Sequence, residues 1–226
     1  MEKGRNLIIA GSGSAGGGEF DAVKISGKGQ VHGDVACDVF KTNGASDIFG
    51  NVQAKTMTVN GASKLEGNLE VGEWKIQGSA DVKGKVSGEV IKVEGFVKIE
   101  GDCEAENFTG KCHFTIGGML NAGFIDIDLY GACSVKEIGG ETIRIQKEMS
   151  FIRLKEMIKS MFNYSDKLTV DTVEGDDIYL EYTKAKVVRG NRVKLGTGCE
   201  VELVEYKESF EQDKDAKVKQ SEKVGS

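Results

Sequence analysis

The sequence predicts an all-β fold, a right-handed three-sided parallel β-helix with about 17 residues per turn and one inserted α-helix. Three observations lead to this prediction. Glycines recur at one fixed step in two series, apolar residues keep the same step, and the apolar positions within each copy come in pairs spaced by two. A fixed short period is the signature of a solenoid, and a spacing of two is the side-chain period of a β-strand.

The two glycine series mark the corners of each turn. The first series is Gly27, Gly44, Gly61, Gly78 and Gly95, and the second is Gly33, Gly50, Gly67, Gly84, Gly101 and Gly118. Glycine adopts backbone angles that cost other residues energy, so it suits a tight corner. We therefore expect three short strands per turn, each ending near a glycine.

The apolar columns between the glycines predict a core shared by all turns. One column is aliphatic in every copy: Val31, Ile48, Leu65, Val82, Ile99 and Ile116. Another column carries large residues, among them Phe40, Met57, Trp74 and Phe108. A single copy cannot bury its apolar face alone, so stacked copies must form one continuous core.

The repeat divides the chain into five segments. Residues 1–19 contain the run GSGSAGGG and are expected to be a flexible lead-in. Residues 20–147 form the predicted β-helix, whose regularity weakens after Gly118. Strand-like alternation resumes over residues 168–206, enough for about two further turns. Residues 207–226 are almost wholly charged or small after Phe210, and we expect them to be disordered.

Residues 148–164 interrupt the repeat and predict an amphipathic helix. The segment has no glycine, and its apolar residues follow helical spacing: Phe151, Leu154, Met157, Ile158, Met161 and Phe162. Three roles stay open for this helix. It packs across the solenoid, docks a partner through these apolar residues, or lies on a membrane surface.

Composition excludes several classes of function. The net charge of −6 argues against nonspecific binding to nucleic acid, and no stretch is long and apolar enough for a membrane span. The five cysteines form no C-x-x-C motif and are expected to be reduced, without a metal. The glycine-rich run lacks the Lys-Ser ending of a phosphate loop, so neither a nucleotide nor another cofactor is expected.

The glycine-rich lead-in, the run VKISGKGQVHGDV and the short hydrophobic-x-hydrophobic-x-Gly copies together resemble the bactofilins, which are bacterial polymer-forming cytoskeletal proteins. The resemblance covers residues 18 to about 146, and the segment VEGDDIYLEYTKAKVVRGNRVKLGTGCEVELVEYKE looks like the second half of a longer Gram-positive version. It implies end-to-end filaments that form without nucleotide and serve cell shape, the cell envelope or motility. It further implies a cytoplasmic protein at or near the membrane.

Self-assembly is also expected on physical grounds. An uncovered β-helix end exposes unpaired backbone groups, which can pair with a strand of another chain. The candidate contacts on the terminal turns are Val23, Ile25 and Val31 at one end and Val193, Leu195 and Val201 at the other. The expected partner is therefore another copy of the chain. Further candidates are membrane-associated or cell-envelope proteins, and the membrane itself through the N-terminus.

Two alternatives to a filament remain. The first is a scaffold or regulator that does not polymerise and binds a partner through the helix at 148–164. The second is a β-helix enzyme, an acyltransferase or a polysaccharide lyase. Such enzymes usually need a histidine base, and the chain has only His32 and His113. His32 is expected to point outward beside a corner, so we predict that the chain is not an enzyme.

Overall fold

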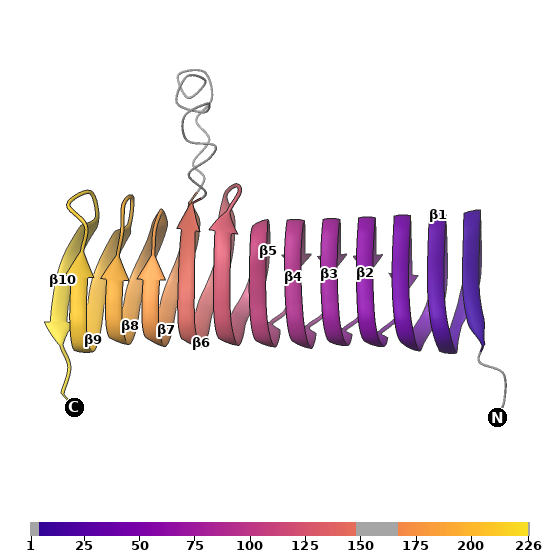
Figure 1. Ribbon diagram of the computed structural model, residues 1–226, viewed down its shortest axis with the longest axis horizontal. Coiled ribbons are helices and arrows are strands. Elements are labelled where there is room, and N and C mark those ends of the chain that lie inside the picture. The colour runs from indigo at the N-terminus through magenta and orange to yellow at the C-terminus, as the bar shows by residue number, and fades with distance from the viewer. Residues whose placement is uncertain (1–4, 148–166, 226) are drawn as a thin grey trace, which may run out of the picture. The chain divides into compact units, whose positions relative to one another are not determined.

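The computed structural model describes residues 5–147 and 167–225 and divides the chain into two compact units, Met1–Asn107 and Phe108–Ser226. Each unit is a coil of parallel β-strands, so the predicted β-helix is confirmed (Figure 1). The described residues contain no helix. The helix predicted at 148–164 lies outside the described residues.

Unit 1 holds β1 (Asn6–Phe49), β2 (Val52–Leu65), β3 (Leu69–Val82), β4 (Val86–Ile99) and the start of β5 (Cys103–Leu129). β1 through β4 pair in order and in parallel. Gly44 lies beside Gly61, Gly61 beside Gly78, and Gly78 beside Gly95, which confirms the step predicted from the glycines.

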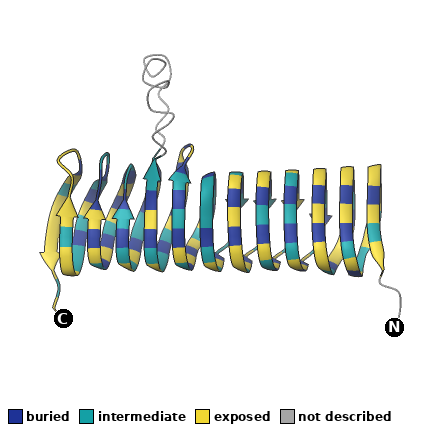
Figure 2. Cartoon of the chain, viewed as in Figure 1, coloured by how far each residue is buried: buried dark blue, intermediate teal, exposed yellow. Residues whose placement is uncertain are grey.

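Each coil of unit 1 has three faces, which are named here from the coil of residues 52–68. Their inward residues are Val52 and Ala54 on the first face, Met57 and Val59 on the second, and Ser63 and Leu65 on the third. Figure 2 shows buried positions recurring at the same place on successive coils. Outward residues alternate with these inward residues, as the period of two requires.

The core of unit 1 is a set of ladders with one side chain per coil. Met57 lies beside Phe40 on one side and Trp74 on the other, and Ile91 follows; all four are buried. Hydroxyl groups occupy another part of the interior. Thr42 Oγ1 donates a hydrogen bond to Ser46 Oγ, which donates to Ser63 Oγ, each at 3.0 Å. The buried hydroxyls therefore satisfy one another.

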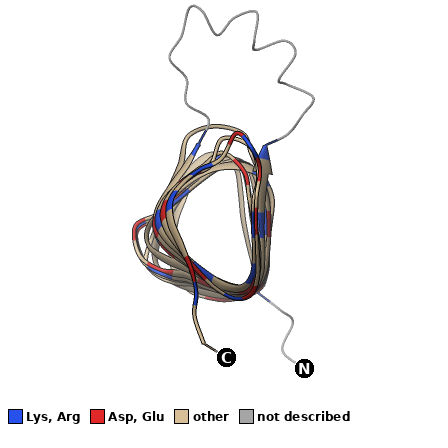
Figure 3. Ribbon diagram, turned by 90° about the vertical axis from the view of Figure 1, so that its left-hand side faces the viewer, with Lys and Arg blue, Asp and Glu red and all other residues tan. Residues whose placement is uncertain are grey.

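Unit 2 holds the rest of β5, β6 (Cys133–Lys147), β7 (Leu168–Leu180), β8 (Thr183–Leu195), β9 (Glu200–Gln212) and β10 (Lys217–Lys223). Its strands also pair in order and in parallel. The step from one coil to the next varies here: it is longer than in unit 1 between β5 and β6, where Leu120 pairs with Ile138, and shorter between β7 and β8, where Gly175 pairs with Gly190. Seen end-on in Figure 3, the individual coils have a rounded three-sided outline.

Two segments that were expected to be flexible or disordered are strands. β1 begins at Asn6, so most of the lead-in is an additional coil, and the Asp21 N–H donates to the Arg5 carbonyl at 2.9 Å. At the other end β9 reaches Gln212, and β10 pairs Val218 with Val201. The prediction of flexibility or disorder from composition was wrong in both places. Backbone hydrogen bonds to the neighbouring coil can order a glycine-rich or a charged segment.

Candidate assembly surfaces

The first coil of unit 1 leaves one edge open among the described residues. In later coils, outward residues direct their N–H groups toward the preceding coil. Glu66 N–H donates to the Ile48 carbonyl at 3.0 Å, and Glu100 N–H donates to the Val82 carbonyl at 2.9 Å. In the first coil the outward residues are Asn6, Ile8 and Ala10, and no described strand precedes them. Their backbone groups therefore point to the open side.

Glycine geometry identifies the same edge as a stacking surface. A Cβ atom on Gly27 would lie 2.2 Å from the Gly11 carbonyl oxygen, and one on Gly44 would lie 2.3 Å from that of Gly27. The coils therefore stack backbone on backbone at this corner. Gly11 has a φ of +85°, yet a Cβ there would meet no described atom within 4 Å. This corner of the first coil leaves room for another backbone to approach.

The outer edge of β10 in unit 2 is built differently. β10 is a short strand and carries exposed Lys217, Lys219, Glu222 and Lys223. Lys219 Nζ lies 2.8 Å from Glu202 Oε1 on β9. Short strands with charged side chains are a common way to discourage pairing at a sheet edge. This edge is therefore less suited to strand addition than that of the first coil.

The six residues predicted to form the assembly contacts are all buried within a single chain. Val23, Ile25 and Val31 are fully buried, and the coil that begins at Asn6 precedes them. Val193, Leu195 and Val201 are at most 2% exposed. β9 covers the first two, and β10 covers Val201. The prediction that they lie on terminal turns was wrong, because both ends carry a further coil.

The residues of the open edge were not predicted from the sequence. The signal was present in the run Leu7–Ala10 followed by Gly11, which precedes Gly27 by slightly less than the regular glycine step. That small change of spacing hid the first coil from a search for a strict period. The partner-helix candidates Phe151, Leu154, Met157, Ile158, Met161 and Phe162 lie outside the described residues.

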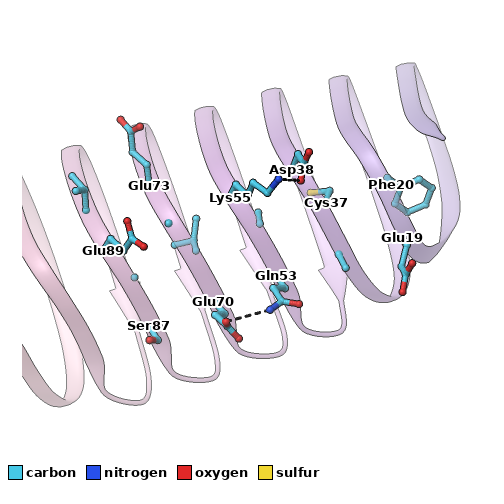
Figure 4. Close-up of a pocket in the computed structure, with 16 residues that line it drawn as sticks. Glu19, Phe20, Cys37, Asp38, Gln53, Lys55, Glu70, Glu73, Ser87 and Glu89 are labelled. Atoms are coloured by element: carbon cyan, nitrogen blue, oxygen red, sulfur yellow. Dashed lines mark hydrogen bonds and ion pairs between the residues drawn. The ribbon is translucent and has the colours of Figure 1, made fainter. Parts of the chain in front are cut away.

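A groove of about 890 Å³ runs across successive coils of unit 1 on the first face. Its floor is formed by small and apolar residues, including Cys37, Ala54, Val71 and Gly88. Figure 4 shows Glu70 and Gln53 along one border and Asp38, Lys55 and Glu73 along the other. The acids and the single lysine of the lining are Glu19, Asp38, Lys55, Glu70, Glu73 and Glu89. The groove is therefore apolar at its floor and acidic along its borders.

Two polar contacts organise the borders of this groove. Lys55 Nζ lies 2.7 Å from Asp38 Oδ1, and the hydrogen bond raises the pKa of Lys55. Gln53 Nε2 donates to Glu70 Oε1 at 3.2 Å. Both contacts join neighbouring coils, so they hold the borders at the coil spacing of about 4.8 Å.

Cys37 provides a chemical probe of the groove. Of the five cysteines it alone is partly exposed, and the other four are buried. Burial, followed by the nearby Asp38 carboxylate, raises the pKa of the Cys37 thiol to about 11. Both effects disfavour the thiolate, so the thiol stays protonated at neutral pH.

We therefore expect one slow thiol modification in the folded chain. The rate with a maleimide should rise about tenfold per pH unit from neutral pH toward the pKa of about 11, since only the thiolate reacts. Mass spectrometry of a proteolytic digest would locate the label. Rapid modification at neutral pH, or modification of Cys103 before Cys37, would contradict this description of the groove.

Metal sites and membrane-spanning helices are not found among the described residues. No group of three or more His, Cys, Asp and Glu side chains within them is placed to hold a metal ion. In the same part of the chain no helix is long and apolar enough to cross a membrane. His32 is exposed and stacks on Phe49 with ring centroids 4.8 Å apart, so the expectation that it points outward is confirmed.

Comparison with known proteins supports the resemblance found in the sequence. Residues 7–104 match the family model of the bactofilins, described as polymer-forming and cytoskeletal. This match begins earlier and ends earlier than the range of 18 to 146 expected from the motifs. It places the first coil inside the matched region.

Two uncharacterized proteins of Bacillus subtilis strain 168 are similar to part of the chain. YhbF is 38% identical over 108 residues, which are 47% of this chain and 42% of YhbF. YhbE is 36% identical over 110 residues, which are 48% of this chain and 44% of YhbE. The chain thus spans less than half the length of these relatives. No solved structure matches it.

Proposed function

We propose that this chain is a structural cytoskeletal protein that assembles end to end into filaments without nucleotide. The bactofilin match over residues 7–104 supports a polymer-forming role. The observation that carries the proposal is the open edge of the first coil, where outward residues direct backbone groups toward no described strand. An edge of this kind recruits another strand through main-chain hydrogen bonds.

Strand addition at this edge needs no rearrangement of the chain. The hydrogen-bonding groups are already held in line by the coil beneath, and the open corner at Gly11 lets another backbone approach. A preorganised edge loses little conformational entropy when a partner binds. Neither hydrolysis nor nucleotide binding is required to drive such assembly, because the driving force is burial and hydrogen bonding.

The proposed filaments also have a proposed role in the cell. We propose that the filaments scaffold processes of the cell envelope, cell shape or motility, from the cytoplasmic side at or near the membrane. The principal partner is another copy of the chain. In a filament each open first-coil edge takes the outer edge of β10 of the next copy, whose charged side chains slow its pairing with other strands. Membrane-associated or envelope proteins are further proposed partners.

The test is a change that blocks the edge and leaves the coil intact. Ile8 is 67% exposed, and its backbone N–H points to the open side. Ile8→Pro removes that donor, as proline does on natural edge strands. Losing one or two junction hydrogen bonds should raise the protein concentration needed for assembly about tenfold. Pelleting assays and negative-stain microscopy in nucleotide-free buffer would measure it.

Ile8→Ala is the matched control, because it removes the apolar side chain and retains the N–H group. It should assemble nearly as well as the unaltered chain. If both variants lose assembly equally, the junction depends on the side chain rather than on strand addition. Filaments of Ile8→Pro at the original concentration, or monomers of the unaltered chain under all conditions, would contradict the proposal.

A further inference from the structure

Charge is separated between two faces of unit 1. The outward column of the second face is a lysine ladder, defined as Lys24, Lys41, Lys75 and Lys92. Lys75 lies directly beside Lys92 on the next coil, and Thr58 stands between Lys41 and Lys75. The acidic groove of the first face carries five carboxylates and one lysine. Each face therefore has an excess of one sign.

This separation is unlike the charge pattern of unit 2. There Arg189 lies between Glu174 and Glu205, at 3.0 and 2.6 Å, so charges of opposite sign occupy adjacent coils. Arg192 likewise pairs with Asp177 and Glu208. In the lysine ladder the one ion pair among the described residues joins Lys92 to Glu94, at 3.5 Å.

Adjacent like charges on neighbouring strands repel and destabilise the sheet that carries them. The ladder sets Lys24 beside Lys41 and Lys75 beside Lys92, and among the described residues it forms an ion pair with one carboxylate, that of Glu94. In the groove, Glu19, Glu73 and Glu89 form no ion pair with described residues. Each surface thus has one ion pair within the chain and several charges of the same sign that are not paired with described residues.

We propose that the acidic groove receives the lysine ladder of a second copy of this chain, lying side by side with the first. Both surfaces run across successive coils, and both repeat at the coil spacing of about 4.8 Å. Lysines on the coils of one copy can therefore face carboxylates on the coils of the other, except at the coil that carries Lys55 and Thr58. The apolar floor of the groove accepts the methylene stems of the lysines.

The contact joins two different surfaces, so it does not close on itself. The pair as a whole keeps one unused groove, on one copy, and one unused ladder, on the other, so further copies can add sideways. Lateral association of this kind is separate from the end-to-end junction. The side-by-side contact rests on the proposed function in one respect. If the chain forms filaments, the contact can be seen as an increase in filament width.

Salt provides the first arm of the test. In about 0.05 M salt the unaltered chain should form wide bundles, and in about 1 M salt the same filaments should separate into single ones, because the screening length falls to about 3 Å. End-to-end hydrogen bonding is less sensitive to salt. Filament length should therefore persist while width falls at least about twofold.

Charge reversal provides the second arm. The ladder variant, Lys24→Glu/Lys41→Glu/Lys75→Glu, makes both surfaces acidic and should give single filaments at low salt. A control variant, Lys28→Glu/Lys184→Glu/Lys214→Glu, changes the net charge equally at exposed lysines outside the ladder. The control should bundle like the unaltered chain. Circular dichroism would establish that each variant is folded.

The groove variant, Glu70→Lys/Glu73→Lys/Glu89→Lys, makes both surfaces basic and should also give single filaments. Mixing it with the ladder variant restores a pair of opposite surfaces at every contact, so bundles should return only in the mixture. A variant that failed to fold could not produce this rescue.

The outcomes separate this inference from the proposed function. Bundles that both variants retain, or single filaments of the unaltered chain at all salt concentrations, would overturn the side-by-side contact and leave end-to-end assembly standing. Capture of a fluorescent octalysine peptide by a chain that never bundles would also overturn it, in favour of a basic peptide as the occupant. If no filaments form, sedimentation velocity of the same variants and mixture still decides whether side-by-side oligomers exist.

Discussion

Replacing Gly61 with alanine is expected to destabilise unit 1 by about 3 kcal/mol or more. Gly61 has a φ of +135°, which side chains rarely tolerate, and its Cβ would lie 2.2 Å from the Gly44 carbonyl oxygen. The Gly44 carbonyl oxygen belongs to the backbone, so it cannot move away by a change of rotamer as a side-chain atom can. To relieve the clash, two coils must move apart and weaken the hydrogen bonds between them.

Gly16→Ala is the matched control for this change. A Cβ there meets nothing within 4 Å, and the φ of Gly16 is not in the left-handed region. Alanine should be neutral or stabilise by up to about 1 kcal/mol. Urea titration followed by the fluorescence of Trp74, the one tryptophan of the chain, reports on the unit that holds both sites. Equal midpoints for the two variants would contradict backbone-on-backbone stacking.

Replacing Trp74 with alanine is expected to cost about 3–5 kcal/mol, the usual loss for a large aromatic residue in a core. Trp74 is fully buried and lies between Met57 and Ile91 on the neighbouring coils. The cavity cannot collapse easily, because strand spacing fixes the distance between these neighbours. Circular dichroism during urea titration would measure the loss.

Trp74→Phe separates the volume of the ring from its polar atom. The Trp74 Nε1–H is buried and has no acceptor among the described residues. Phenylalanine leaves a smaller cavity and removes that unsatisfied donor, so its cost should be under about 2 kcal/mol. A loss as large as that of Trp74→Ala would show that the indole is held by more than packing.

The repeat could be predicted from sequence because its evidence is local and redundant. Gly44, Gly61 and Gly78 occupy the same corner of successive coils, and the expected inward residues of the same coils are buried. Each copy confirms the register of the next. The β-helix therefore followed from the sequence without any knowledge of long-range contacts.

The ends could not be predicted in the same way. The first coil departs slightly from the regular step, and its glycine-rich composition is typical of a linker. The last strand consists mainly of charged residues, a composition typical of disorder. Both segments are ordered by pairing with the coil beneath, an interaction that composition does not report. The residues predicted to form the assembly contacts consequently lie one coil inside the outermost coil.

The acidic groove also escaped the sequence analysis, for a different reason. Its residues come from separate coils and share no motif. Glu70 and Glu89 occupy non-equivalent positions in their copies, and Asp38 stands in the same column as Lys55. Only the stacking of coils places them along one groove. A map of outward charges by face, rather than by column, would have located it.

We propose that copies of this chain join through the open edge of the first coil. Cryo-electron microscopy of the chain assembled in nucleotide-free buffer would show this junction. We expect filaments in which the coil spacing of about 4.8 Å continues without a break across each junction, with Asn6, Ile8 and Ala10 in backbone hydrogen bonds to the next copy. Filaments whose junctions leave this edge exposed to solvent, or an assembled form without end-to-end contacts, would contradict it.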